Sequence, residues 1–142
     1  MTYSFKKVHP AIAIVLTNIT LGAYVPFWFL SRRKSVEQLF KTNINYKSLY
    51  ILLFLYIFMA LYYFMGKALF TELGANLVET INLWITFIGL GITYYSVFRF
   101  AEAIEQELDD IQFNKTLLIL FHIWYLQFKI NKIPNRLNAI NL

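Results

Sequence analysis

The sequence predicts an all-α integral membrane protein with two transmembrane helices, two shorter broken segments and amphipathic cytoplasmic helices. Residues 48–66 and 80–98 each run for 19 residues without a charged side chain, and 58% of the 142 residues are hydrophobic. A helix of that length is about 29 Å long, which matches the roughly 30 Å hydrocarbon core of a bilayer. We therefore expect one helical membrane domain over residues 1–142.

Residues 10–31 form another uncharged run, which is long enough to span a membrane but is interrupted in its middle. The interrupting residues are Asn18, Thr20, Gly22 and Pro26. Proline removes a backbone donor and glycine loosens the backbone, so we expect a helix break here. A break within a bilayer must be surrounded by protein or water.

The last membrane segment, residues 114–133, is uncharged only over residues 116–128. It spans if Lys129 and Lys132 extend to the headgroups, and otherwise it re-enters or lies in the interface. Two polar residues lie within it, His122 and Gln127. We interpret His122 as bonding a neighbouring helix, with a proton-carrying or ligand-binding role as the alternative.

The distribution of Lys and Arg favours two spans over four. If all four segments span, the two sides of the membrane carry six and seven basic residues. If only residues 48–66 and 80–98 span, one side carries twelve and the other only Lys67. The positive-inside rule favours the second arrangement, with both termini cytoplasmic and the two broken segments re-entrant or interfacial. A repeat at an offset of 68 residues, in which 36–38 resemble 104–106, favours four spans, so both arrangements stay open.

The second uncharged run carries small and polar residues at spacings of 4, 3, 4 and 3, which place them on one helix face. They are Asn82, Thr86, Gly89, Thr93 and Ser96. In lipid, such residues let helix backbones approach and form hydrogen bonds. We interpret this stripe as a helix-packing face within one chain or between copies. The alternative is the lining of a pore or substrate path.

A basic segment precedes the first spanning run and an acidic segment follows the second, on the same predicted side of the membrane. We expect the second spanning helix to run from about Thr80 to Ile111. Residues 99–115 carry a net charge of −3 and residues 31–47 a net charge of +4, so we expect the segments to dock. The predicted pairing sets Arg32, Arg33 and Lys34 against Glu102, Glu105 and Asp109. The alternative is a solvated acidic face and a basic face on lipid headgroups.

Composition excludes several kinds of site. The chain has no cysteine, which excludes disulfides, thiolate catalysis and cysteine-based metal centres. Its two isolated histidines do not make a metal site, and its dispersed glycines form no phosphate loop. The net charge of +5 is scattered over loops and does not predict nucleic-acid binding. We therefore expect no enzyme activity, no cofactor and no metal. The expected partners are the lipid bilayer and a second copy or another membrane protein.

Three stretches of the chain resemble a known family. They are residues 19–24 followed by Trp28, the stretch of Arg99 and residues 101–105, and residues 125–132. Together they resemble, in order and over nearly the whole chain, small bacterial multi-pass proteins of the domain of unknown function 4234 family. The resemblance implies a helical protein of the bacterial cytoplasmic membrane and no known activity.

The predicted function follows from these patterns. We expect a small integral membrane protein that acts as an interaction or assembly module and associates with itself. The alternative is a subunit of an oligomeric pore or a small transporter, with the broken segment around Asn18 to Gly22 lining a polar path.

Overall fold

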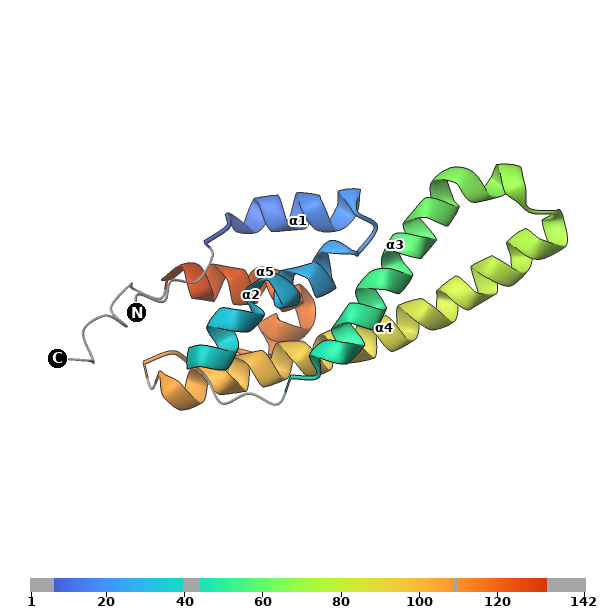
Figure 1. The fold of residues 1–142 in the computed structure, drawn as a ribbon. Coiled ribbons are helices and arrows are strands. Elements are labelled where there is room, and N and C mark those ends of the chain that lie inside the picture. The colour runs from blue at the N-terminus through green and yellow to red at the C-terminus, as the bar shows by residue number, and fades with distance from the viewer. Residues whose placement is uncertain (1–6, 40–43, 109, 133–142) are drawn as a thin grey trace.

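The computed structural model describes residues 7–39, 44–108 and 110–132, which are mostly helical and contain no strand. Five helices follow one another: α1 (Pro10–Ile19), α2 (Tyr24–Leu39), α3 (Tyr46–Leu69), α4 (Glu72–Glu107) and α5 (Lys115–Lys132). Helices α3 and α4 form a long antiparallel hairpin, and the other three gather around its open end, here called the base (Figure 1). The all-α prediction is confirmed.

Helices α3 and α4 contain the two predicted 19-residue runs, and within the described ranges these are the two helices long and apolar enough to cross a membrane. The Asn45 side chain accepts a hydrogen bond from the Ser48 N–H at the start of α3, and Thr71 accepts one from the Gly74 N–H at the start of α4. Because Thr71 provides this cap, α4 begins well before the predicted start at Thr80, and it ends at Glu107 rather than Ile111.

The predicted break in residues 10–31 is present between α1 and α2. Leu21 and Gly22 have positive φ angles of 49° and 91°, and the Gly22 N–H donates to the Thr17 carbonyl at 2.9 Å. Helix α2 then runs back toward the base (Figure 1). Pro26 was expected to contribute to the break but lies in the first turn of α2, where its missing N–H costs nothing. Gly22, rather than Pro26, makes the reversal.

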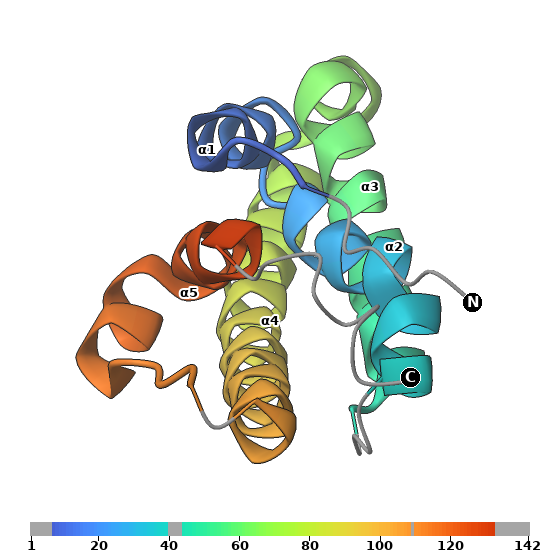
Figure 2. The ribbon, with the colours of Figure 1, turned by 90° about the vertical axis from the view of Figure 1, so that its left-hand side faces the viewer.

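Helix α5 also reverses direction within the predicted membrane segment. His122 has φ 27° and ψ −113°, which kinks the helix between two short halves. Figure 2 shows the bend between the two halves, and the Asn114 N–H donates to the Tyr125 hydroxyl at 3.3 Å, which brings the second half back beside the start of the first. Two segments far apart in sequence therefore fold as helix–turn–helix units, and both turns lie beside the hairpin.

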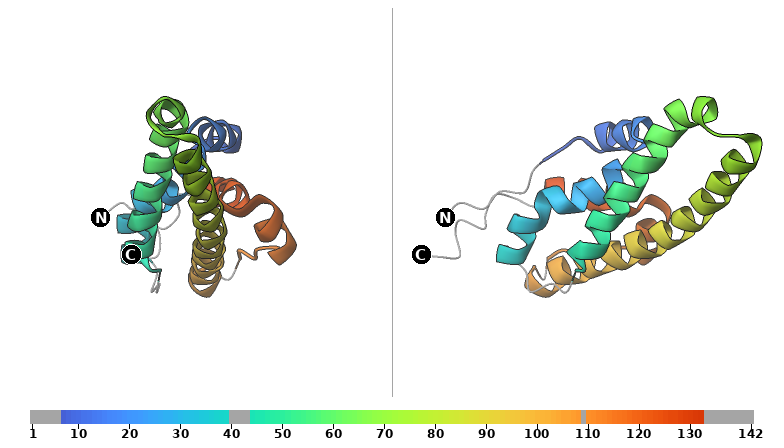
Figure 3. Two further views of the ribbon diagram at one scale, coloured as in Figure 1. Left: turned by 90° about the vertical axis from the view of Figure 1, so that its right-hand side faces the viewer. Right: turned by 45° about the vertical axis from the view of Figure 1, so that its right-hand side comes forward.

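The buried core lies at the base. Aromatic rings of α2 and α4 meet there, with ring centroids 5.5 Å apart for Trp28 and Phe100 and 6.0 Å apart for Phe29 and Phe100. Ile123, Leu126 and Ile130 of α5 are fully buried against the same cluster. The tip of the α3–α4 hairpin, in contrast, extends clear of the other helices (Figure 3). Most of the buried side chains therefore lie at one end of the molecule.

Candidate functional site

A pocket lined by both polar and apolar side chains lies where the α1–α2 turn and the α5 kink meet the middle of the hairpin. It consists of two adjoining cavities of about 480 and 230 Å³, which share Thr17, Asn18, Gly22 and Tyr56. The larger cavity is also lined by Leu21, Met59, Ala60, Tyr63, Asn82 and Thr86. The smaller is also lined by Val25, Leu90, Thr93, Tyr94, His122 and Trp124. We call the two cavities together the mid-hairpin pocket.

Two glycines bring three helices together around Tyr56. A methyl group on Gly22 would lie 3.5 Å from Tyr56 Cε2, which places the α1–α2 turn directly beside the middle of α3. A methyl group on Gly89 would clash with the Tyr56 hydroxyl and lie 2.9 Å from Leu52 Cδ1. Gly89 therefore lets α3 approach α4 and seats the Tyr56 hydroxyl in the pocket wall.

The structure divides the predicted stripe of α4 into two parts. Gly89, Thr93 and Ser96 are buried within the chain, as expected of a helix-packing face. Asn82 and Thr86 are exposed and line the larger cavity. The stripe thus packs against the chain near the base and lines the pocket nearer the tip.

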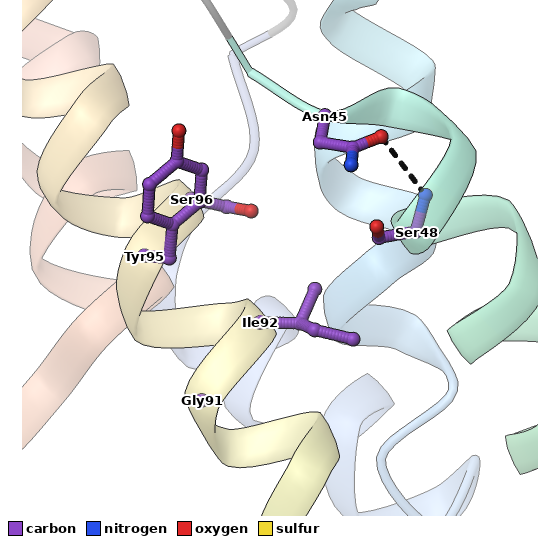
Figure 4. A pocket seen from close by; sticks show the side chains of 6 residues that line it. All are labelled: Asn45, Ser48, Gly91, Ile92, Tyr95 and Ser96. Carbon is purple, nitrogen blue, oxygen red and sulfur yellow. Dashed lines mark hydrogen bonds between the residues drawn. The ribbon is translucent and has the colours of Figure 1, made fainter.

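Ser96 also borders a separate pocket of about 270 Å³ between the start of α3 and the facing turns of α4. Figure 4 shows its lining, in which Asn45 and Ser48 face Ile92 and Ser96 across the opening. The Asn45 amide oxygen in this wall is already engaged as the cap of α3, at 3.3 Å from the Ser48 nitrogen. This second pocket therefore belongs to the capping structure at the start of α3.

His122 and Gln127 have different surroundings, although the sequence places them one turn apart. His122 lines the smaller cavity, where its ring centroid lies 4.7 Å from that of Trp124 and 6.4 Å from that of Tyr94. The Trp124 indole N–H donates to Thr17 Oγ1 at 3.4 Å, which joins α5 to α1. Gln127 instead lies in the core.

The sequence analysis did not identify Tyr56, Tyr94 and Trp124 as pocket residues, because aromatic residues are dense throughout this chain.

A buried hydrogen-bond network centres on Gln127. Trp28 Nε1 and Arg32 Nη2 both donate to Gln127 Oε1, at 2.7 and 2.6 Å. Gln127 Nε2 donates to Asn131 Oδ1 at 2.7 Å, and Asn131 Nδ2 donates to the Val8 carbonyl at 2.7 Å. The network therefore ties α2, α5 and the segment before α1 together.

Arg32 enters this network as a buried cation. Its side chain is 2% exposed, and its guanidinium carbon lies 4.2 Å from the centre of the Trp28 ring. Burial lowers the pKa of Arg32 to about 10, so the group stays charged at neutral pH. Arg32 was predicted to face acidic residues of α4, but the structure turns it inward against Trp28 and Gln127.

The other predicted charge pairs between α2 and α4 are replaced by contacts closer in sequence. Arg33 pairs with Glu37 at 2.9 Å, and Arg99 pairs with Glu102 at 3.1 Å. These are neighbours at i,i+4 and i,i+3 on one helix, which reach each other without any tertiary arrangement.

The remaining charges of that prediction also fall elsewhere. Glu105 Oε1 accepts a hydrogen bond from the Phe113 N–H at 2.6 Å and so holds the loop after α4. Lys34 is exposed, and Asp109 lies outside the described residues.

Within the part of the chain that the structure describes, no three His, Asp or Glu side chains lie close enough together to hold a metal ion.

Comparison with family models, curated proteins and solved structures finds no match. The resemblance to the domain of unknown function 4234 family therefore stays a prediction.

Proposed function

We propose that this chain is a small integral membrane protein that acts as an interaction module within the bilayer. The observation that carries the proposal is the apolar surface of the α3–α4 hairpin. Phe64 is 75% exposed, Leu73 is 73% exposed and Trp84 is 65% exposed. Only 17% and 22% of the most apolar windows of the two helices is buried. A soluble protein buries its apolar core helices, whereas lipid covers such a surface without cost.

The charge distribution supports the orientation of the hairpin. The hydrogen bond from Asn131 Nδ2 to the Val8 carbonyl holds the two ends of the described chain together at the base. Of the thirteen basic residues, Lys67 alone lies between the two uncharged runs in sequence, and the other twelve lie before the first run or after the second. The proposal therefore places the base on the cytoplasmic side, with α1–α2 and α5 re-entering from that side.

Asn82 supports association with a second copy or another membrane protein. Apolar surface does not drive helices together in lipid, but interhelical hydrogen bonds do. Asn82 is exposed near the middle of the hairpin, and within the described residues its side chain makes no hydrogen bond. Gly89, Thr93 and Ser96 are already buried in the chain, so the proposed contact uses the part of the stripe nearer the tip.

A pore or transporter subunit is the second candidate function. The specific observation in its favour is that both helix reversals, at Gly22 and at His122, line the mid-hairpin pocket. In transporters, broken helices carry polar sites near the middle of the bilayer.

Membrane crossing is tested by labelling single cysteines, because the chain contains none of its own. Glu72→Cys lies at the tip of the hairpin and Gln112→Cys lies at the base, and both side chains are exposed. In sealed vesicles with the non-cytoplasmic face outward, a membrane-impermeant maleimide should label Glu72→Cys at once and Gln112→Cys only after permeabilisation. Equal labelling of both in sealed vesicles would contradict a crossing hairpin.

The two candidate functions are separated with matched asparagine variants. Asn82→Leu removes the exposed amide of the stripe, whereas Asn76→Leu makes the same change on α4 outside the pocket. Loss of oligomeric mass in nanodiscs for Asn82→Leu alone supports the interaction module. Altered ion flux with an unchanged oligomeric mass supports the pore.

A further inference from the structure

The mid-hairpin pocket is open on one side, and polar and apolar side chains line it together. The larger cavity, of about 480 Å³, falls in the size range of ligand pockets. Leu21 and Tyr63, at 46% and 68% exposure, stand at its edge. If the hairpin crosses a bilayer, this opening faces acyl chains rather than water.

The polar groups of the pocket include both donors and acceptors that the chain leaves available. Thr86 Oγ1 donates to the Asn82 carbonyl at 2.9 Å, and Asn18 Nδ2 donates to the Ile14 carbonyl at 2.9 Å. The lone pairs of Thr86 Oγ1 and Asn18 Oδ1 remain as acceptors. Within the described part of the chain, the Tyr56 hydroxyl and the Asn82 amide make no hydrogen bond, so they remain as donors.

The chemistry of the lining excludes a charged head group. No Lys, Arg, Asp or Glu is among the residues lining either cavity. A phosphate in this position would be removed from water with no Lys or Arg beside it, which is costly. A neutral group that carries hydroxyls would satisfy both the donors and the acceptors without that cost.

We infer that the mid-hairpin pocket binds a neutral, hydroxyl-bearing head group of a lipid such as diacylglycerol. The hydroxyl and ester oxygens meet Tyr56, Asn82 and Asn18, and the acyl chains leave between Leu21 and Tyr63. This inference rests on the proposed membrane crossing. A water-soluble polyol offers the same hydroxyl chemistry, so the experiment must distinguish the two sources.

The test uses a photoactivatable diacylglycerol with the full-length protein in phosphatidylcholine nanodiscs. Unlabelled diacylglycerol, glycerol and phosphatidic acid serve as competitors. We expect diacylglycerol to compete, with crosslinks in α1, α3 and α4 around the pocket, and glycerol and phosphatidic acid not to compete. Competition by glycerol at the same concentration would make the ligand a soluble polyol and overturn the lipid assignment. Equal competition by phosphatidic acid would overturn the requirement for a neutral head.

Matched variants locate the site. The double variant Tyr56→Phe/Asn82→Leu removes two donors with little change of volume, and Asn76→Leu is the control on the same helix. We expect the double variant to weaken competition by about tenfold and the control to leave it unchanged. Equal labelling of double variant and control would overturn the inference.

The inference and the proposed function fail separately. Cysteine labelling at Glu72 and Gln112 reports membrane crossing without any ligand. If that labelling shows a crossing hairpin and diacylglycerol does not compete, only the pocket assignment is wrong. If it shows no crossing, the proposed function fails as well.

Discussion

The indole nitrogen of Trp28 donates to the side-chain oxygen of Gln127 at 2.7 Å, across 99 positions of the sequence. Trp28 lies just after the reversal at Gly22, and Gln127 lies just after the reversal at His122. The bond therefore connects the returning halves of two helix–turn–helix segments. Together with the bond from Trp124 to Thr17, it holds the two segments against each other.

Gln127→Leu should destabilise the base strongly. The change leaves the buried Trp28 and Arg32 donors without their shared acceptor, and an unsatisfied buried donor costs about 1–3 kcal/mol. We expect the free energy of unfolding in mixed micelles, followed by far-UV circular dichroism, to fall by about 3 kcal/mol. Gln127→Glu keeps an acceptor and should lose less. Gln112→Leu changes an exposed side chain and is the control; an equal loss in both leucine variants would contradict the network's importance.

Two glycines of α4 provide a matched pair for the α3–α4 contact. A methyl group on Gly89 would clash with the Tyr56 hydroxyl, whereas one on Gly91 meets nothing within 4 Å. Gly89→Ala should therefore lower the free energy of unfolding by about 1–2 kcal/mol, because Tyr56 or α3 must move. Gly91→Ala should leave stability unchanged or slightly raised, since alanine is the better helix former. Similar values for the two variants would show that α3 does not approach α4 at Gly89.

Gly22→Ala tests which residue makes the first reversal. Its φ of 91° is unfavourable for any residue with a Cβ atom, and we expect a loss of about 1–2 kcal/mol. Pro26→Ala leaves the turn intact and should lose less, because Pro26 lies within the first turn of α2. Thermal unfolding monitored by tryptophan fluorescence compares the two variants. A greater loss for Pro26→Ala would assign the reversal to the proline after all.

The ion pairs of α2 and α4 should be energetically independent of each other. Arg33 and Glu37 are 43% and 42% exposed, so solvent screens their i,i+4 ion pair and the pair contributes little to stability. A double-mutant cycle over Arg33→Gln and Glu37→Gln should show a small favourable coupling. The cycle over Arg33→Gln and Glu102→Gln should show none, and a coupling there as large as the one within α2 would restore the predicted docking of the two segments by charge.

The features that depend on a local sequence pattern could be predicted without the structure. Uncharged runs of spanning length predicted the apolar parts of α3 and α4. Gly22 predicted the first break, because glycine is the residue that tolerates a positive φ at little cost. The spacing from Asn82 to Ser96 predicted one face of α4, since the helical period alone aligns those residues.

Which residues these features contact depends on the tertiary structure and could not be predicted from local patterns. His122 has no local signal for a positive φ, and its kink exists because α5 returns to bury Leu126 and Gln127 against α2 and α4. Net charge predicted that Arg32 would face α4, but packing on Trp28 turned it into the core. Tyr56 reaches Gly89 only because α3 and α4 cross there. Contacts between residues so far apart in sequence depend on the whole packed arrangement, which no short pattern encodes.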